Sequence, residues 1–277
     1  MNDKLSSYLS KKGISGPWKI EPELTKIYHQ IIVVPSYAER FTLPELLGSI
    51  GRQSKELLKN TVVIVVVNNG ESAPMKDKEN NKLTIEFLKN TKFPFDLRWV
   101  DATTDNYMLP EKTAGVGIAR KIGLDLALSF AEPDTLLFST DADCTLENDY
   151  LSYILNDYHT YNWLAAVVGF YHRRTSDPII NDAITKYENF LVMTAEKLED
   201  AGSIFGYPSV GSTMISTAMT YASVGGMSRK KATEDFYFLQ ECAKFCGVKW
   251  IKKVLVHPSA RSENRVYLGT GFRMSQA

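Results

Sequence analysis

The stretch that decides the fold is GVGIARKIGLDLALSF followed by AEPDTLLFSTDAD, residues 115–143. Apolar residues recur at helical spacing over 117–130, which predicts an amphipathic helix. The run 135–139 is typical of a buried strand, and it ends at Asp141 and Asp143. Open α/β sheets place their ligands at the carboxyl ends of their strands. This stretch therefore indicates both a sheet and a site at its edge.

Similar strand and helix segments flank this stretch on both sides. We expect further strands at 31–34, 62–67, 97–100, 163–171, 214–217 and 250–256, and helices at 41–58, 83–89, 151–159, 182–200 and 234–245. The alternation of strand and helix as far as residue 143 predicts a doubly wound, mostly parallel α/β sheet.

Composition limits the class of protein. The 277 residues carry 32 basic and 32 acidic side chains, so a protein that coats nucleic acid is disfavoured and we expect no nucleic-acid partner. No apolar run reaches the roughly 18 residues of a transmembrane helix, which leaves only peripheral membrane contact open. Three cysteines, and a start without the apolar segment of a secretory signal, favour a cytoplasmic location.

The pair Asp141 and Asp143 is the first candidate for chemistry. Carboxylates at i and i+2 on an extended backbone point to the same side, so both can face one hard cation, Mn²⁺ or Mg²⁺. Such a cation can bridge the oxygens of a diphosphate. The alternative is a solvated turn, because aspartate is common where strands end.

Further candidates lie in the second half of the chain. Glu234 and Asp235 begin a predicted helix, where acidic residues either stabilise the first turn or remove a proton from an attacking hydroxyl. His257 follows a predicted strand and is either a structural residue or a metal ligand. Arg261 and Arg265 lie in a segment rich in Ser and Gly, where they either are solvated or close over phosphates or an anionic acceptor.

Other motifs speak against alternative enzyme classes. Gly115-Val116-Gly117 precedes a helix, but it does not follow the first strand, and Arg120 replaces the third glycine of a dinucleotide-binding loop. Neither a P-loop nor a G-x-S-x-G nucleophile elbow is present. These patterns disfavour a nicotinamide-dependent oxidoreductase, a P-loop enzyme and an α/β-hydrolase.

Five segments, in order, resemble the motifs of the family 2 glycosyltransferases of the GT-A fold. They are IIVVPSYAER from residue 31, VVIVVVNNGES from 62, GVGIARKIGLDLA from 115, LLFSTDAD from 136 and VGGMSRKKATEDF from 224. The resemblance covers about residues 30–257, and five ordered motifs are more specific than any one alone. It implies a Rossmann-like, mostly parallel sheet flanked by helices, with a smaller mixed sheet on the acceptor side.

The resemblance also implies an organisation of the chain. Residues 1–27 would form an N-terminal extension, 28–257 a GT-A catalytic domain, and 258–277 a flexible basic C-terminal segment. Within the catalytic domain, 28–143 would be the nucleotide-binding half and 144–257 the acceptor-binding half.

The implied reaction is metal-dependent transfer of a sugar from a UDP- or GDP-linked donor to a hydroxyl of a carbohydrate or lipid-linked acceptor, with inversion. Asp143 and Asp141 would bind Mn²⁺ or Mg²⁺, with His257 as an additional ligand. Asp235 would be the general base, and Glu234 would position the acceptor or the base. The residues implied to bind the nucleotide sugar are Pro35, Ser36, Glu39, Asn69, Gly117, Arg120 and Asp141.

One departure from the family pattern and two rival functions stay open. The family usually has acidic residues where this chain has Asn68-Asn69, and the choice between uridine and guanosine is open because an amide donates as well as accepts. A nucleotidyltransferase acting on a sugar phosphate usually has a glycine-rich loop after the first strand, whereas PSYAERFTLP has no glycine. A catalytically inactive nucleotide-sugar-binding domain is the other rival, although both acidic pairs are retained.

Overall fold

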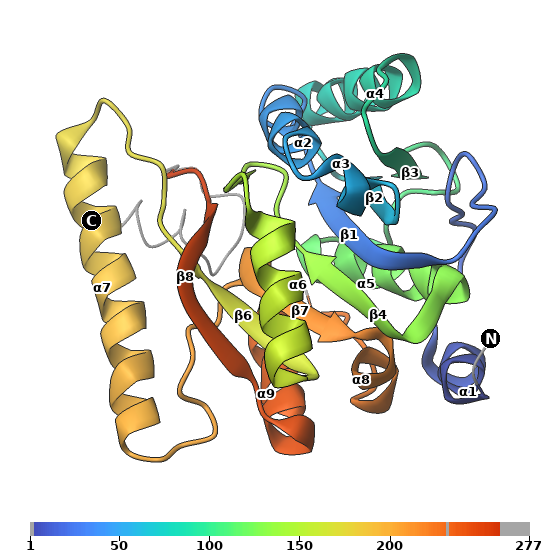
Figure 1. Cartoon of the computed structure of the whole chain (residues 1–277). Helices are drawn as coiled ribbons and strands as arrows, with labels where there is room; N and C mark the ends of the chain where they lie inside the picture. The colour runs from blue at the N-terminus through green and yellow to red at the C-terminus, as the bar shows by residue number, and fades with distance from the viewer. Residues whose placement is uncertain (1–2, 231–232, 261–277) are drawn as a thin grey trace.

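The computed structural model describes residues 3–230 and 233–260, and its eight strands form one sheet in the order β3-β2-β1-β4-β7-β6-β8-β5 (Figure 1). The strands are β1 Tyr28–Ser36, β2 Thr61–Asn68, β3 Asp96–Ala102, β4 Ala131–Ser139, β5 Thr145–Leu146, β6 Ala165–Phe170, β7 Met214–Thr217 and β8 Lys249–His257. The α-helices are α1 Asp3–Lys12, α2 Leu43–Gly51, α3 Lys55–Leu58, α4 Met75–Asn90, α5 Val116–Ala127, α6 Tyr150–Tyr161, α7 Pro178–Asp200, α8 Ala218–Ser223 and α9 Glu234–Cys246.

The first half of the chain forms the parallel part of the sheet. β1 pairs in parallel with β2 and with β4, and β2 pairs in parallel with β3. Every residue of β2 is buried, as its run of β-branched side chains predicts for a strand covered on both faces. The expected α/β sheet flanked by helices is thus confirmed.

The mixed part of the sheet continues directly from the parallel part. β7 is antiparallel to β4, with Leu136 opposite Thr217 and Phe138 opposite Ile215. On its other side β7 is antiparallel to β6, which runs parallel to β8, and β5 closes the order antiparallel to β8. The parallel and mixed parts therefore share a single sheet.

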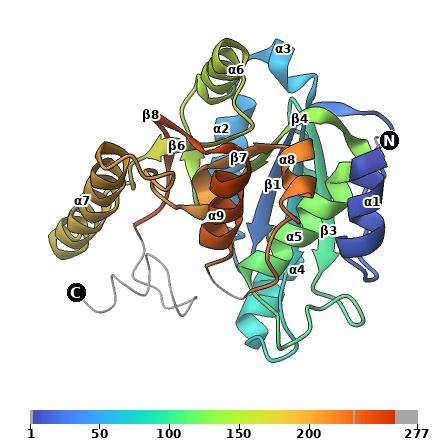
Figure 2. The same ribbon diagram turned by 90° about the horizontal axis from the view of Figure 1, so that it is seen from below.

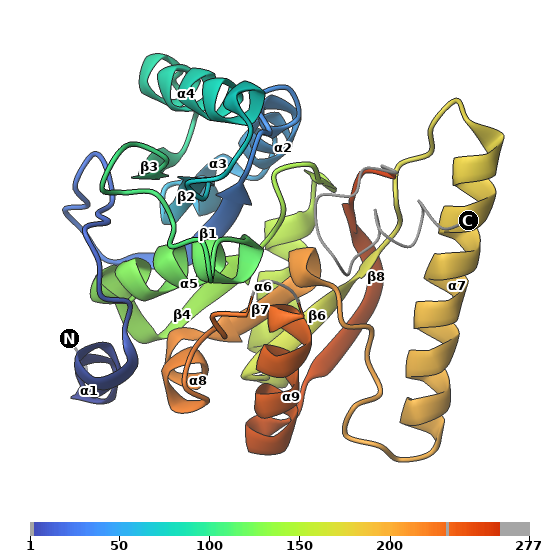
Figure 3. The ribbon, with the colours of Figure 1, turned by 180° about the vertical axis from the view of Figure 1, so that it is seen from behind.

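Helices cover both faces of this sheet. Alternate residues of β1 point to opposite sides, so Ile31 and Val33 belong to one apolar core and Ile32 and Val34 to the other. Figure 3 shows α1, α5, α8 and α9 over one face, while α2, α4 and α6 cover the other and α7 stands beyond β8. In the part of the chain that the structure describes, no helix has the length and apolar character to cross a membrane.

Several elements differ from those expected. The helix predicted over 41–58 is broken into α2 and α3, with Gly51 and Ser54 at the break, because glycine and serine have lower helix propensity than alanine or leucine. The helix predicted over 83–89 starts earlier, directly after Pro74. The sequence does not predict α8 and β5, because six and two residues are too few to show a periodic pattern.

The N-terminal helix is fastened to the core by a buried carboxylate. Asp125 of α5 accepts hydrogen bonds from the hydroxyls of Tyr8 (2.8 Å) and Tyr221 (2.7 Å), and Lys121 Nζ lies 2.8 Å from its second oxygen. Figure 2 shows α1 beside α8. At Gly226, with φ +71°, a β-carbon would lie 1.8 Å from the Tyr8 hydroxyl. The helix therefore packs directly on the turn that precedes α9.

We expect Tyr8→Phe to lower the free energy of unfolding by roughly 1–2 kcal/mol, because a buried carboxylate loses one of its donors. Urea unfolding followed by circular dichroism measures the change. The control is Tyr153→Phe on α6, a partly exposed tyrosine whose substitution should cost little. Equal stability of Tyr8→Phe and the unmodified chain would contradict a stabilising role for this hydrogen bond.

Candidate active site

Several of the predicted site residues lie where the parallel strands end. Ser36 ends β1 and Asn68 ends β2, and the two strands are in register there, with Ser36 opposite Val67. Asp141 follows β4, whose last residues pair with the middle of β1. The carboxyl ends of β1, β2 and β4 thus form one edge, as expected for a ligand site in such a sheet.

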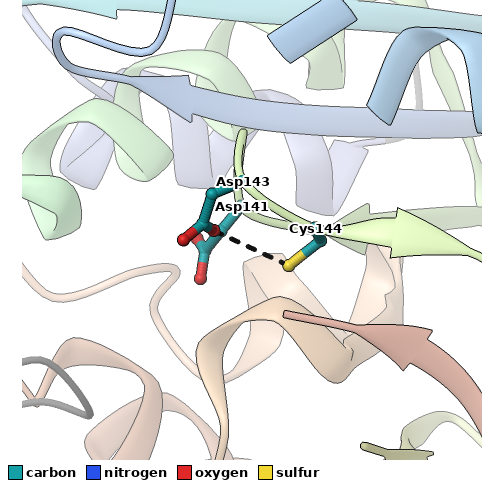
Figure 4. Close-up of side chains that lie close together, drawn as sticks. All are labelled: Asp141, Asp143 and Cys144. Atoms are coloured by element: carbon teal, nitrogen blue, oxygen red, sulfur yellow. Dashed lines mark hydrogen bonds between the residues drawn. The ribbon is translucent and has the colours of Figure 1, made fainter. Parts of the chain in front are cut away.

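Asp141 and Asp143 offer a pair of oxygen ligands. Figure 4 shows their carboxylates on the same side of the loop after β4, and one ligand atom from each, together with Cys144 Sγ, lies within 4.8 Å of the others. Carboxylate oxygens suit Mn²⁺ and Mg²⁺, whereas thiol sulfur suits softer metals. Burial raises the pKa of the Cys144 thiol well above its usual value, and the charges of the two aspartates add to the rise. The donor set therefore fits a hard divalent cation held by the aspartates.

Arg120 joins the two acidic motifs. Its guanidinium, on α5, forms ion pairs with Asp141 and with Glu234, and only 2% of the residue is exposed. Burial alone would lower the pKa of Arg120, but the negative charges of Asp141, Glu234 and Asp235 raise it overall. Asp141 and Glu234 lie 21 and 114 positions from Arg120 in the chain. The two ion pairs with Arg120 hold both acidic motifs at one place.

Asp141 is held in an environment that disfavours its charge. Although its side chain keeps 36% of its surface exposed, desolvation by the surrounding protein raises the pKa of its carboxyl. The negative charges of Asp143 and Asp235 add to the rise, and Arg120 opposes it. Four carboxylates and one guanidinium therefore share this edge of the sheet, and a bound cation would relieve the repulsion among the carboxylates.

Glu234 and Asp235 have different environments at the start of α9. Glu234 is 2% exposed and paired with Arg120, so it does not face an incoming substrate. Asp235 is partly exposed, and its Oδ1 accepts a hydrogen bond from the backbone N–H of Phe236 at 2.7 Å. Of the two, Asp235 has the side chain that solvent or a ligand can reach.

The burial of Glu234 predicts that the stability of the fold depends on pH. Burial raises the pKa of its carboxyl from 4.5 to about 7, the charges of Asp235 and Asp141 add to the rise, and Arg120 opposes it. Because the pKa is higher in the folded chain, the stabilisation is complete below pH 4.5 and is lost as the pH rises through about 7. We expect unfolding to cost roughly 1 kcal/mol more at about pH 6 than at about pH 8.

Urea titrations of the unmodified chain and of Glu234→Gln at both pH values measure this difference. The variant lacks the titrating carboxyl and keeps the four histidines, whose contribution therefore cancels. An identical pH dependence in the two chains would show that Glu234 does not take up a proton on folding.

Gly117 is required by close packing between α5 and the segment before α9. A β-carbon at this position would lie 2.2 Å from the carbonyl oxygen of Lys230 and 3.0 Å from Cβ of Glu234. On the other side of the ion pairs, a β-carbon at Gly211 would lie 2.6 Å from the guanidinium of Arg120. Backbone thus encloses Arg120 and Glu234, and contact of Gly117 with a nucleotide stays a prediction.

The residues predicted to bind the nucleoside line the loop after β1 and the end of β2. Pro35 and Glu39 are buried, and the buried hydroxyl of Ser36 has no hydrogen-bond partner among the residues that the structure describes. Asn69 Oδ1 accepts a hydrogen bond of 3.0 Å from the side chain of Asn81 on α4. Asn81 also accepts from the backbone N–H of residue 38 at 2.8 Å.

Asn81 is a contact that sequence reasoning missed. The sequence holds one clue to this contact, the pair Asn80-Asn81 inside a helix. Asparagine is unfavourable there unless its side chain forms hydrogen bonds with another part of the chain. Because its amide holds both Asn69 and the loop after β1, it sets the shape of the predicted nucleoside pocket.

His257 is not part of the aspartate group in the described residues. His257 lies outside the Asp141–Asp143 group, because its Nδ1 is 3.0 Å from the carbonyl oxygen of Tyr171 and its Nε2 is 2.7 Å from Glu147. Arg261 and Arg265 lie outside the described residues. The roles predicted for all three from sequence stay predictions.

Comparison with solved structures identifies the class of fold. The structure superposes on S. aureus TarS 1–349 in complex with UDP-GlcNAc with a TM-score of 0.54 and 13% identity, covering 91% of this chain and 61% of that one. It superposes on the mannosyltransferase PcManGT from Pyrobaculum calidifontis, in complex with GDP-Man and Mn²⁺, with a TM-score of 0.51 and 17% identity, covering 95% and 64%. The chain therefore spans less than two thirds of the length of either protein.

These likenesses show that the chain has the GT-A fold, as the order of its motifs predicts. No protein-family model matches the sequence, and no curated protein matches it. At 13% and 17% identity the likeness extends to the fold, and the function has to be argued from the site itself.

Proposed function

We propose that the protein is a metal-dependent glycosyltransferase that moves a sugar from a nucleoside diphosphate to an acceptor hydroxyl, with inversion. One observation carries this proposal: Arg120 holds Asp141 of the D-x-D pair and Glu234 of the Glu-Asp pair together at one edge of the sheet. Two structural neighbours support it: TarS in complex with UDP-GlcNAc, and the mannosyltransferase PcManGT in complex with GDP-Man and Mn²⁺.

On the donor side, Asp143 and Asp141 would hold Mn²⁺ or Mg²⁺. When bound, the cation supplies positive charge that stabilises a departing diphosphate. Pro35, Ser36 and Asn69 would line the nucleoside pocket, where the buried Ser36 hydroxyl has no hydrogen-bond partner among the described residues. The remaining predicted contacts on this side, which stay candidates, are Glu39, Gly117, Arg261 and Arg265.

On the acceptor side, Asp235 would take the proton of the acceptor hydroxyl while that oxygen attacks the anomeric carbon. Attack from the face opposite the departing diphosphate inverts the configuration at that carbon. Glu234 is buried, so it would not contact the substrate. It would instead hold Arg120 in place through their ion pair. A carbohydrate or lipid-linked acceptor is the proposed partner.

The decisive experiment is a thermal-shift titration of the full chain with UDP or GDP, each with and without Mn²⁺. A ligand that binds only the folded state raises Tm, and at about 100 times its Kd it adds roughly 2.7 kcal/mol. We expect one nucleotide to stabilise the chain more strongly with Mn²⁺ than without. In Asp143→Ala that extra shift should disappear, while the metal-independent shift remains.

The other outcomes separate the rival functions. Absence of a shift with either nucleotide would contradict the proposal. Release of pyrophosphate from a nucleoside triphosphate and a sugar phosphate would identify a nucleotidyltransferase. A nucleotide sugar that binds and stays intact with every acceptor, as seen by mass spectrometry, would identify a binding domain.

A further inference from the structure

Asp143 is contacted by two side chains from distant segments. The hydroxyl of Ser259, after β8, donates a hydrogen bond to Asp143 Oδ2. The guanidinium of Arg173, after β6, donates through Nη2 to the backbone carbonyl of Asp143 at 2.9 Å. One partner thus holds the carboxylate and the other holds the backbone that carries it.

Both partners are themselves held in place. Ser259 lies between Pro258 and Ala260, which are both buried. The backbone N–H of Arg173 donates to the carbonyl of Pro258 at 2.8 Å, so the two segments run side by side. The other end of the Arg173 guanidinium forms an ion pair with Glu45 in the first turn of α2. Two separate segments therefore converge on Asp143, and one of them is tied to α2.

We propose that Ser259 and Arg173 are positioning residues that keep Asp143 in the orientation in which it binds the divalent cation. The inference rests on the metal site of the proposed function. A free aspartate side chain samples several rotamers, and ordering it on binding costs entropy. Hydrogen bonds that already fix a ligand remove part of this cost, and losing such a partner typically weakens metal binding about 10- to 100-fold.

The test is a titration of the full chain with Mn²⁺ alone, with free Mn²⁺ measured by electron paramagnetic resonance. We expect Ser259→Ala to raise the Kd for Mn²⁺ about 10-fold or more, because the Asp143 carboxylate loses the hydroxyl of Ser259 that orients it. Ser259→Thr keeps a hydroxyl and should stay within about 3-fold of the unmodified chain. The matched control is Ser10→Ala, an exposed serine on α1 whose hydroxyl bonds only a nearby backbone carbonyl.

Arg173→Lys separates positioning from charge. Lysine keeps the positive charge, but its single ammonium cannot reproduce the planar fork that spans Asp143 and Glu45. We therefore expect weaker Mn²⁺ binding in Arg173→Lys as well. Circular dichroism melts of all four variants check that the fold is kept.

The outcomes distinguish this inference from the proposed function. If the unmodified chain does not bind Mn²⁺, the proposed metal site fails. If the unmodified chain binds Mn²⁺ and Ser259→Ala binds it equally well or more tightly, the metal site stands and the positioning role of Ser259 is wrong. Equal binding by Arg173→Lys would likewise remove Arg173 from the inference.

Discussion

Arg120→Met is expected to lower the free energy of unfolding by roughly 3–5 kcal/mol, because it leaves a buried carboxylate without its partner. Glu234 is as deeply buried as the arginine and forms one of its two ion pairs. The loss should be smaller at about pH 6 than at about pH 8, since a protonated Glu234 no longer carries an unpaired charge. Urea unfolding of Arg120→Met and of the unmodified chain at both pH values measures this loss.

Two further variants test the cause of this destabilisation. The double variant Arg120→Met, Glu234→Gln has no unpaired buried charge, so it should be more stable than Arg120→Met alone. The losses caused by the two single substitutions should therefore not add. The matched control is Arg98→Met on β3, where a less buried arginine faces Asp96 at 3.7 Å and the expected cost is about 1 kcal/mol or less. Similar losses for Arg98→Met and Arg120→Met would contradict the central place of the Arg120 ion pairs.

Asp235→Asn is expected to lower the rate of sugar transfer by about 10²- to 10⁴-fold, the usual contribution of a positioned general base. An amide keeps the size and the hydrogen bond to Phe236 but cannot accept the acceptor proton. Donor binding should change little, because the proposed function assigns Asp235 to the acceptor side. Transfer is measured by mass spectrometry of the products, and donor binding by the thermal shift with nucleotide and Mn²⁺.

The control for Asp235→Asn is Glu241→Gln, which removes an exposed carboxylate from the same helix, where it pairs with Lys244. This variant should transfer sugar at the unmodified rate. Transfer by Asp235→Asn at the unmodified rate would show that another group takes the proton. A loss of nucleotide binding in Asp235→Asn would instead place Asp235 on the donor side.

The sequence predicts most of the fold because its core strands are long runs of a distinctive type. The run 62–67 consists of β-branched residues throughout, and the structure buries every residue of β2. Short elements escape this kind of reasoning, since α8 and β5 contain too few residues for a period to appear. The continuity of the sheet through β4 and β7 also depends on pairing between distant segments, which no local pattern encodes.

The site is predictable where acidic residues stand next to the ends of elements. Asp141, Asp143, Glu234 and Asp235 all have such positions, and the structure brings them together. The partners of these residues are less accessible to sequence reasoning: Ser259 lies 116 positions from Asp143 and is one serine among many. Arg120 is predicted beside the nucleotide, and the structure shows its guanidinium between two carboxylates, a place that only tertiary packing defines.

The antiparallel pairing of β4 with β7 restricts how the parallel and mixed parts of the sheet can move relative to each other. An enzyme built from two separate lobes can open by hinge rotation between them. Here such a rotation would break the backbone ladder in which Leu136 lies opposite Thr217 and Phe138 opposite Ile215. In the proposed transferase, product release should therefore depend on loops at the edge of the sheet. Where release is slow, the turnover rate should follow the motion of those loops.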